Sequence, residues 1–213
     1  MTLPRLYPIL DTGMLAQRNC DASAAAGAML AGGARILQFR DKRHFSRGVF
    51  EQAEHVAELC RRAGAIFVID DRADIAMLLD AGVHIGQDDL PPQDARRLIG
   101  PGRLLGFSMH NEAQLRAASS EPVDYVAVGP IFGTTSKEQP DPVVGIEELR
   151  KLRTMETRPL VAIGGITREN ALTVLDAGAD SVAVIGDLLP PECSFETIRM
   201  RMEEWQRLLA FTS

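Results

Sequence analysis

The sequence has few cysteines and no long apolar run. Cys20, Cys60 and Cys193 are widely spaced and form no CxxC or Cys/His pattern, which argues against a disulfide framework and against a structural zinc site. No run of about eighteen apolar residues is present to cross a bilayer, and "MTLPRLYPILDTG" at the N-terminus lacks the apolar stretch of a signal peptide. We therefore expect a cytoplasmic protein without a membrane partner.

Positively charged residues are also fewer than negatively charged ones. The 213 residues include 23 Lys and Arg against 29 Asp and Glu, a formal net charge of -6. This balance argues against a nucleic-acid partner, although a small anionic substrate needs only a local basic cluster. The composition, with 46% hydrophobic and 24% charged residues, is that of an ordinary globular protein, and the length fits one domain over 1–213.

Short apolar runs alternate with segments of helical spacing along the whole chain. The runs predict eight strands, at 6–11, 34–40, 65–70, 82–87, 104–109, 125–132, 159–166 and 181–186. They are too apolar for one face to lie in water, so we expect a parallel sheet covered by helices. Eight such units close most economically into a single-domain (β/α)8 TIM barrel. A doubly wound open sheet is the alternative, but no GxGxxG follows the first run.

The active site of such a barrel lies at the C-terminal ends of the strands. There, "QFRDK" places Gln38, Arg40 and Lys42 on one side of an extended chain, where Arg and Lys suit a phosphate group. "GTTSK" at 133–137 adds hydroxyl groups and a lysine after another strand. The alternatives are a solvated strand end for the first motif and a polar loop without a function for the second.

Glycines after the seventh and eighth strands predict a monophosphate site. In "AIGGITREN", Gly164 and Gly165 let the backbone approach a ligand, and Thr167 is expected to cap the next helix. Gly186 in "VIGDLLP" offers further backbone amides, and the loops after strands seven and eight commonly bind phosphate in these barrels. The alternative is turn-forming glycines without a ligand.

Two carboxylates follow the third and fourth strands. If these strands are neighbours, Asp71 and Asp89 lie close together beside Arg40 and Lys42, a suitable arrangement for Mg²⁺ with a polyphosphate. The alternative for each aspartate is a helix N-cap. His84 lies within the fourth strand and has two interpretations. It is a core histidine, hydrogen-bonded to Gln38 or Gln87, or it is a catalytic residue.

The succession "QFRDK", "IDDR", "AGVHIGQDD", "GFSMH", "GPIFGTTSK", "AIGGI" and "VAVIG" resembles the thiamine-phosphate synthase family, in the same order and over nearly the whole chain. The resemblance implies a transferase that joins 4-amino-2-methyl-5-hydroxymethylpyrimidine diphosphate to hydroxyethylthiazole phosphate. Thiamine phosphate and pyrophosphate would be the products, and Mg²⁺ the cofactor. A homo-oligomer formed through the outer helices is expected by the same likeness.

The resemblance also implies a role for each matching residue. Gln38 would contact the pyrimidine, and Asp71 and Asp89 would bind Mg²⁺. The diphosphate would be held, and its departure catalysed, by Arg40, Lys42, Ser108 and Lys137, with Asp70 at the same subsite. The thiazole phosphate would be held by Thr134, Ser136, Gly165, Ile185 and Gly186.

The chain departs from the family pattern at three positions. Asp70 stands where the family usually has Asn, Ala81 where it has Asp, and Gly186 where it has a hydroxyl residue. An extra carboxylate at Asp70 would repel a diphosphate unless it is protonated, bound to metal or turned away. Two further functions therefore stay open: a thiazole tautomerase-like isomerase and a non-catalytic phosphate-binding barrel.

Overall fold

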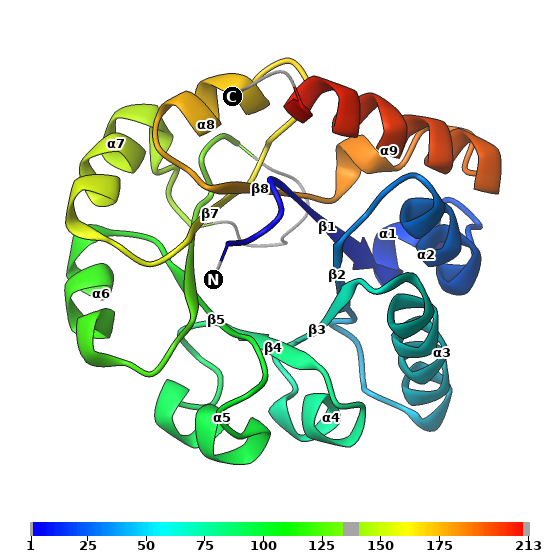
Figure 1. The fold of residues 1–213 in the computed structure, drawn as a ribbon, viewed down its shortest axis with the longest axis horizontal. Coiled ribbons are helices and arrows are strands. Elements are labelled where there is room, and N and C mark those ends of the chain that lie inside the picture. The colour runs from blue at the N-terminus through cyan, green and yellow to red at the C-terminus, as the bar shows by residue number, and fades with distance from the viewer. Residues whose placement is uncertain (1, 134–140, 211–213) are drawn as a thin grey trace.

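The eight predicted strands form a closed parallel barrel in chain order (Figure 1). The computed structural model describes residues 2–133 and 141–210. Its strands are β1 Leu6–Asp11, β2 Ile36–Arg40, β3 Ile66–Asp70, β4 Gly82–Ile85, β5 Leu105–Met109, β6 Tyr125–Val128, β7 Leu160–Ile163 and β8 Ser181–Val184. Each strand pairs with the next, and β8 closes the barrel on β1. The (β/α)8 prediction is confirmed.

A ring of helices surrounds the barrel, and it closes where α9 packs against α2 (Figure 1). The helices are α1 Thr12–Gln17, α2 Ala22–Ala31, α3 Arg47–Ala63, α4 Ala73–Leu78, α5 Pro92–Ile99, α6 Glu112–Ala117, α7 Gly145–Met155, α8 Ala171–Asp176 and α9 Phe195–Ala210. Two 3₁₀ turns, η1 Ala118–Ser120 and η2 Gly186–Leu188, follow α6 and β8. Within 2–133 and 141–210, no helix is long and apolar enough to span a membrane.

The structure contains one helix that the sequence analysis did not predict, and one predicted helix cap is wrong. The short helix α1 was not predicted; the Asp11 side chain caps it by accepting from the Met14 amide at 2.8 Å. Thr167 does not cap α8, which begins at Ala171. Instead, the Asn170 side chain accepts from the Thr167 amide at 2.9 Å and donates to the Gly165 carbonyl at 3.0 Å. These bonds fix a tight turn between β7 and α8.

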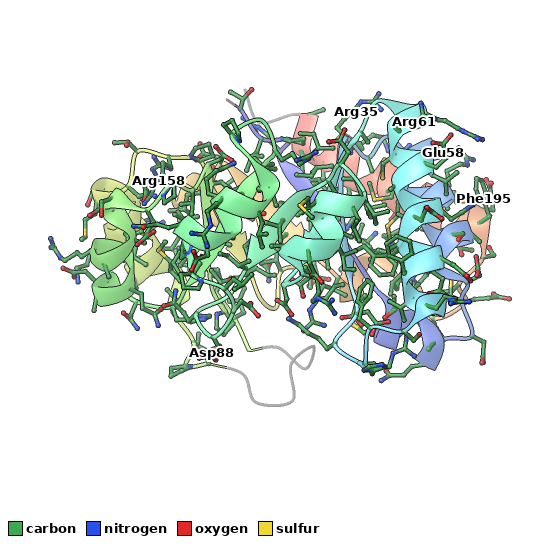
Figure 2. All side chains as sticks on the ribbon, turned by 90° about the horizontal axis from the view of Figure 1, so that it is seen from below. Arg35, Glu58, Arg61, Asp88, Arg158 and Phe195 are labelled. Carbon is green, nitrogen blue, oxygen red and sulfur yellow. The ribbon has the colours of Figure 1, made fainter. Side chains whose placement is uncertain are left out.

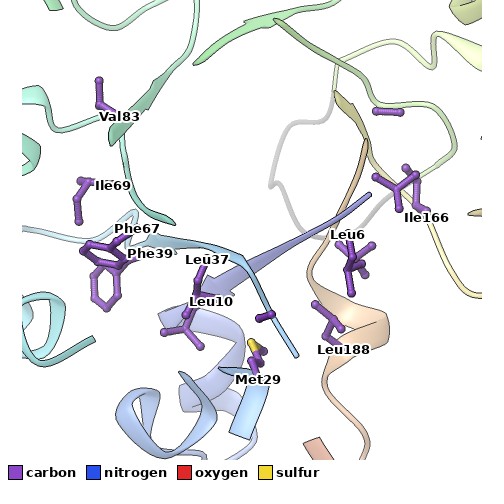
Figure 3. Packing of buried hydrophobic residues seen from close by; sticks show 14 of the residues in the cluster. Leu6, Leu10, Met29, Leu37, Phe39, Phe67, Ile69, Val83, Ile166 and Leu188 are labelled. Atoms are coloured by element: carbon purple, nitrogen blue, oxygen red, sulfur yellow. The ribbon is translucent and has the colours of Figure 1, made fainter. Parts of the chain in front are cut away.

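Side chains along each strand alternate between the barrel interior and the helix layer. On β1 and β2, Leu6, Leu10, Leu37 and Phe39 point outward and pack beneath the helices (Figure 3). The other set forms a second cluster inside the barrel: Leu3, Tyr7, Ile9, Ile36, Val68, Leu104, Tyr125, Ala127, Val161 and Ala183. This alternation decides which polar residues at the strand ends can reach the interior.

The two ends of the barrel differ in the residues they carry. Asp88, in the loop after β4, lies at the lower edge of the molecule in Figure 2, whereas Arg35, just before β2, lies at the upper edge. The lower edge is therefore the C-terminal end of the strands, where a barrel of this type carries its active site.

Candidate active site

A cavity of about 830 Å³ opens at the C-terminal end of the barrel. The described residues that the sequence analysis assigned to the site all line it: Gln38, Arg40, Lys42, Asp70, Asp71, Asp89, Ser108, Gly165, Ile185 and Gly186. Thr134, Ser136 and Lys137 lie outside the described residues. The alternation of the strands explains this convergence, because Gln38 and Arg40 share the inward set of β2 with Ile36.

Basic and acidic side chains interlock at one side of the cavity. Arg40 forms an ion pair with Asp11, its register partner on β1. Lys42 Nζ lies 2.9 Å from Asp70 Oδ2 and also pairs with Asp71. Sequence reasoning missed Asp11, although its inward position follows from the alternation of β1 after Tyr7 and Ile9. The carboxylates hold both cations at the cavity wall.

Asp70 is turned into this cluster rather than away from it. Its side chain is 8% exposed, and Arg40 Nε lies 3.5 Å from Oδ2. Burial, reinforced by the Asp71 charge, raises the pKa of Asp70 to about 6, although Lys42 and Arg40 act in the opposite direction. The carboxyl group therefore takes up a proton at a higher pH than an ordinary aspartate, and a nearby anion would favour that protonation further.

Asp71 and Asp89 form an acidic pair beside the cations. Burial raises the pKa of Asp89, and the neighbouring Asp71 charge adds to the increase. The hydrogen bond from the Gly86 amide acts in the opposite direction but is the smaller effect. The Gly86 amide donates to Asp89 Oδ2 at 2.7 Å. Asp71 has a φ of 62°, in the left-handed region that is unfavourable for most residues.

The acidic pair fits a magnesium ion by the chemistry of its donors. Mg²⁺ prefers oxygen ligands and is usually held by one or two carboxylates, with water and substrate phosphates completing the coordination. In the part of the chain described here, no cluster of three or more His, Cys, Asp or Glu residues forms a complete metal cage. Two crowded carboxylates that repel each other are the arrangement a substrate-bound cation would stabilise.

A chain of hydrogen bonds crosses the barrel beneath the cavity. Gln38 Nε2 donates to the Tyr7 hydroxyl at 3.3 Å, and the hydroxyls of Tyr7 and Tyr125 are 2.9 Å apart. His84 Nδ1 lies 2.9 Å from the Tyr125 hydroxyl, and Nε2 lies 2.8 Å from Ser108 Oγ. The partners of His84 are therefore Tyr125 and Ser108, and the predicted bonds to Gln38 or Gln87 are wrong.

This chain of hydrogen bonds positions Ser108. His84 lies between the Tyr125 hydroxyl and Ser108 Oγ, and so connects Ser108 to the tyrosine pair in the barrel core. Ser108 itself lines the cavity. A hydroxyl group in this place can both donate to and accept from a group bound there.

Gly106 makes room for this chain on β5. A Cβ atom at this position would lie 2.0 Å from Tyr125 Cζ and 2.5 Å from His84 Nδ1. No side chain fits there without displacing both rings. The glycine in "LLGFSM" was the one sequence signal that two bulky inward groups meet at this level of the barrel.

His84 makes the stability of the protein depend on pH. Burial lowers the pKa of His84 from 6.5 to about 4. The unfolded chain therefore takes up a proton below pH 6.5 that the folded chain does not, so this stability is complete above pH 6.5, falls between pH 6.5 and about 4, and decreases no further below that. We expect His84→Gln to remove up to about 3 kcal/mol of this pH dependence in urea unfolding between pH 7.5 and 4.5. His55→Gln, on the exposed face of α3, is the control, and equal pH dependence in all three proteins would contradict the assignment.

The opposite side of the cavity is built from backbone. Gly165 has a φ of 64°, and a Cβ atom there would lie 2.5 Å from the Gly133 carbonyl oxygen. Ile185 and Gly186, at the start of η2, face the cavity beside it. Glycine is required at 165 by both conformation and space. The result is a pocket wall made of backbone, here called the amide wall, and backbone amides are groups that bind oxyanions.

The fold and this site define a class: a (β/α)8 barrel with a cationic and acidic cluster on one side of its mouth and a glycine-rich amide wall on the other. The model of the family "Thiamine monophosphate synthase" matches residues 6–188. The chain belongs to this family.

Individual relatives agree with the family match. The chain is 47% identical over 194 residues to the thiamine-phosphate synthase of Koribacter versatilis, covering 89% of this chain and 90% of that protein. It is 43% identical over 182 residues to the thiamine-phosphate synthase of Chloroflexus aurantiacus, covering 85% and 83%. The structure of a thiamine phosphate pyrophosphorylase from Pyrococcus furiosus superposes with a TM-score of 0.83 at 30% identity, covering 97% and 96%.

Proposed function

We propose that this protein joins 4-amino-2-methyl-5-hydroxymethylpyrimidine diphosphate to hydroxyethylthiazole phosphate, giving thiamine phosphate and pyrophosphate. The observation that carries the proposal is the pairing, across one cavity, of the Arg40, Lys42, Asp71 and Asp89 cluster with the amide wall at Gly165 and Gly186. One side suits a metal-bound diphosphate and the other a monophosphate. Membership of the thiamine monophosphate synthase family supports the same two substrates.

The cationic side would hold the leaving diphosphate. Arg40 and Lys42 would exchange their carboxylate partners for phosphate oxygens, and the Ser108 hydroxyl would donate a further hydrogen bond. Asp71 and Asp89 would bind Mg²⁺, which when present neutralises charge that develops on the departing diphosphate. Asp70 would lie beside this group, where the negative charge of the diphosphate would favour proton uptake by a carboxyl group whose pKa is already raised. Lys137 stays a prediction for the same subsite.

The pyrimidine would lie above the buried hydrogen-bond chain. Gln38, which is 3% exposed, presents its amide to the cavity floor and would contact the ring. The aminopyrimidine can itself stabilise a methylene cation once the C–O bond to the diphosphate breaks. The residues therefore need to stabilise the leaving group and no protein nucleophile is required.

The thiazole phosphate would be held at the amide wall by the backbone of Gly165, Ile185 and Gly186. Thr134 and Ser136 stay predictions for this subsite. The thiazole nitrogen would then attack the methylene cation, forming the C–N bond of thiamine phosphate. Holding the two rings face to face would supply much of the remaining acceleration, and this capture releases no proton, so it needs no general base.

The test is product analysis with the purified protein and both substrates. The proposal expects thiamine phosphate and pyrophosphate in equal amounts, and neither product when one substrate is omitted. Isomerised thiazole phosphate without pyrophosphate would favour the tautomerase-like alternative. Binding of both substrates without turnover would favour the non-catalytic barrel. The Arg40, Lys42, Asp71 and Asp89 cluster argues against both, since neither needs a diphosphate site.

The amide wall makes a prediction at the position where the family usually has a hydroxyl residue. A Cβ atom on Gly186 would meet only Met14 Cε, at an ordinary 3.6 Å. We therefore expect Gly186→Ser to fold normally and to lower the KM for hydroxyethylthiazole phosphate by a few-fold, because an added hydroxyl can donate to the phosphate. Gly186→Ala separates the hydroxyl from the added bulk. An unchanged KM in the serine variant would remove Gly186 from the phosphate subsite.

A further inference from the structure

Three side chains connect the amide wall to the last helix. Arg168 lies in the loop after β7, Asp187 directly follows Gly186 in η2, and Trp205 is fully buried on α9. Trp205 Nε1 and Arg168 Nε both donate to the same oxygen, Asp187 Oδ2, at 2.9 and 3.0 Å. We call these residues the Asp187 cluster.

The Asp187 cluster balances its charges with two neighbours on α9. Arg168 also pairs with Glu204, and Arg201 Nε lies 3.2 Å from the same carboxylate. Arg201 Nη1 donates to the Asp187 carbonyl oxygen at 2.7 Å. Two guanidinium groups therefore compensate two carboxylates.

This arrangement solves an electrostatic problem at the amide wall. Asp187 lines the cavity next to Gly186, where an uncompensated carboxylate would repel a phosphate in a partly buried setting. Its side chain is only 17% exposed, and Arg168 and Trp205 occupy its Oδ2 atom. The wall can accept an anion because that carboxylate is already satisfied.

We propose that Arg168 is a positioning residue that compensates Asp187 and holds its carboxylate away from the monophosphate subsite. The inference rests on the proposed thiazole phosphate site and adds residues outside the amide wall itself. It makes a specific prediction for variants: substitution of Arg168 weakens phosphate binding because the Asp187 charge is no longer compensated. Removing that charge should therefore restore binding.

The experiment measures the Kd of hydroxyethylthiazole phosphate by calorimetry, without turnover. We expect Arg168→Met to weaken binding about tenfold, Asp187→Asn to change it less than threefold, and the double variant to return to within about threefold of the parent protein. The KM for the pyrimidine diphosphate should stay within twofold throughout. Thermal unfolding identifies any variant that does not fold, and Arg168→Gln replaces Arg168→Met in that case.

Arg199→Met is the matched control, because Arg199 likewise pairs with two carboxylates, those of Glu196 and Glu203 on α9. It should leave the Kd unchanged. Unchanged binding in Arg168→Met, or a double variant as weak as Arg168→Met, would overturn the inference; the second result would mean a structural or direct phosphate-binding role for Arg168. If the parent protein itself does not bind the thiazole phosphate, the proposed function fails together with the inference.

Discussion

Asp71→Asn is expected to lower kcat/KM for pyrophosphate release by about 10²- to 10³-fold at any Mg²⁺ concentration that saturates the parent protein. Asp71 shares the acidic pair with Asp89 and contacts Lys42, so losing its charge weakens the metal site and frees the lysine. Asn is the appropriate replacement because it tolerates the left-handed backbone, with φ 62°, better than Ala. Steady-state kinetics over a Mg²⁺ titration measures the effect.

The control for this substitution is Asp80→Asn. Asp80 also has a left-handed backbone, with φ 55°, and pairs with Arg103 on the surface, where its side chain is 86% exposed. It should change kcat/KM less than twofold. Undiminished activity in Asp71→Asn, with the fold intact, would exclude Asp71 from the metal site.

Lys42→Met is expected to lower kcat/KM for the pyrimidine diphosphate by about 10²-fold. Lys42 is the cation shared by Asp70 and Asp71, so its loss removes a phosphate ligand and leaves the acidic residues less compensated. The Kd of hydroxyethylthiazole phosphate should change less than twofold, because that substrate would bind at the opposite wall. Parallel kinetics and calorimetry distinguish the two effects.

Lys151→Met provides the matched control for Lys42→Met. Lys151 is similarly exposed, at 55% against 47%, and also pairs with two carboxylates, Glu112 and Glu148. It lies on α7, outside the residues that line the cavity. Equal losses for both substrates in Lys42→Met would contradict a role confined to the diphosphate.

The barrel was predictable because its signal is periodic. Apolar runs in alternation with helical segments predicted all eight strands, and the alternation of side chains placed Gln38 and Arg40 inside. Four strands, β4, β6, β7 and β8, end earlier than predicted, and the differences are largest at β6 and β7. Pro130 has no amide hydrogen to continue the β6 ladder, and Gly164 and Gly165, with φ of 98° and 64°, turn the chain after β7.

The contacts that organise the site were not predictable in the same way. Tyr7 and Tyr125 are 118 residues apart in sequence, yet their hydroxyls meet inside the barrel. The Asp187 bonds to Arg168 and Trp205 likewise join three separate elements. Such contacts depend on the stagger of strands and on side-chain length, which leave no period in the sequence. Local motifs could identify Asp71 and Ser108 as site candidates, but they could not predict the residues that orient these side chains.

The most direct test of the account follows pyrophosphate and thiamine phosphate together while Mg²⁺ is titrated, in the parent protein and in Asp70→Asn. The account predicts that the parent protein releases both products in equal amounts and only with Mg²⁺, because Asp71 and Asp89 would hold the cation that stabilises the departing diphosphate. It predicts activity in spite of Asp70, because the raised pKa of this carboxyl group makes it easier to protonate when a diphosphate binds beside it. Turnover without Mg²⁺ would contradict the role of the acidic pair. An inactive parent protein beside an active Asp70→Asn variant would show that the barrel has kept the site and lost the reaction.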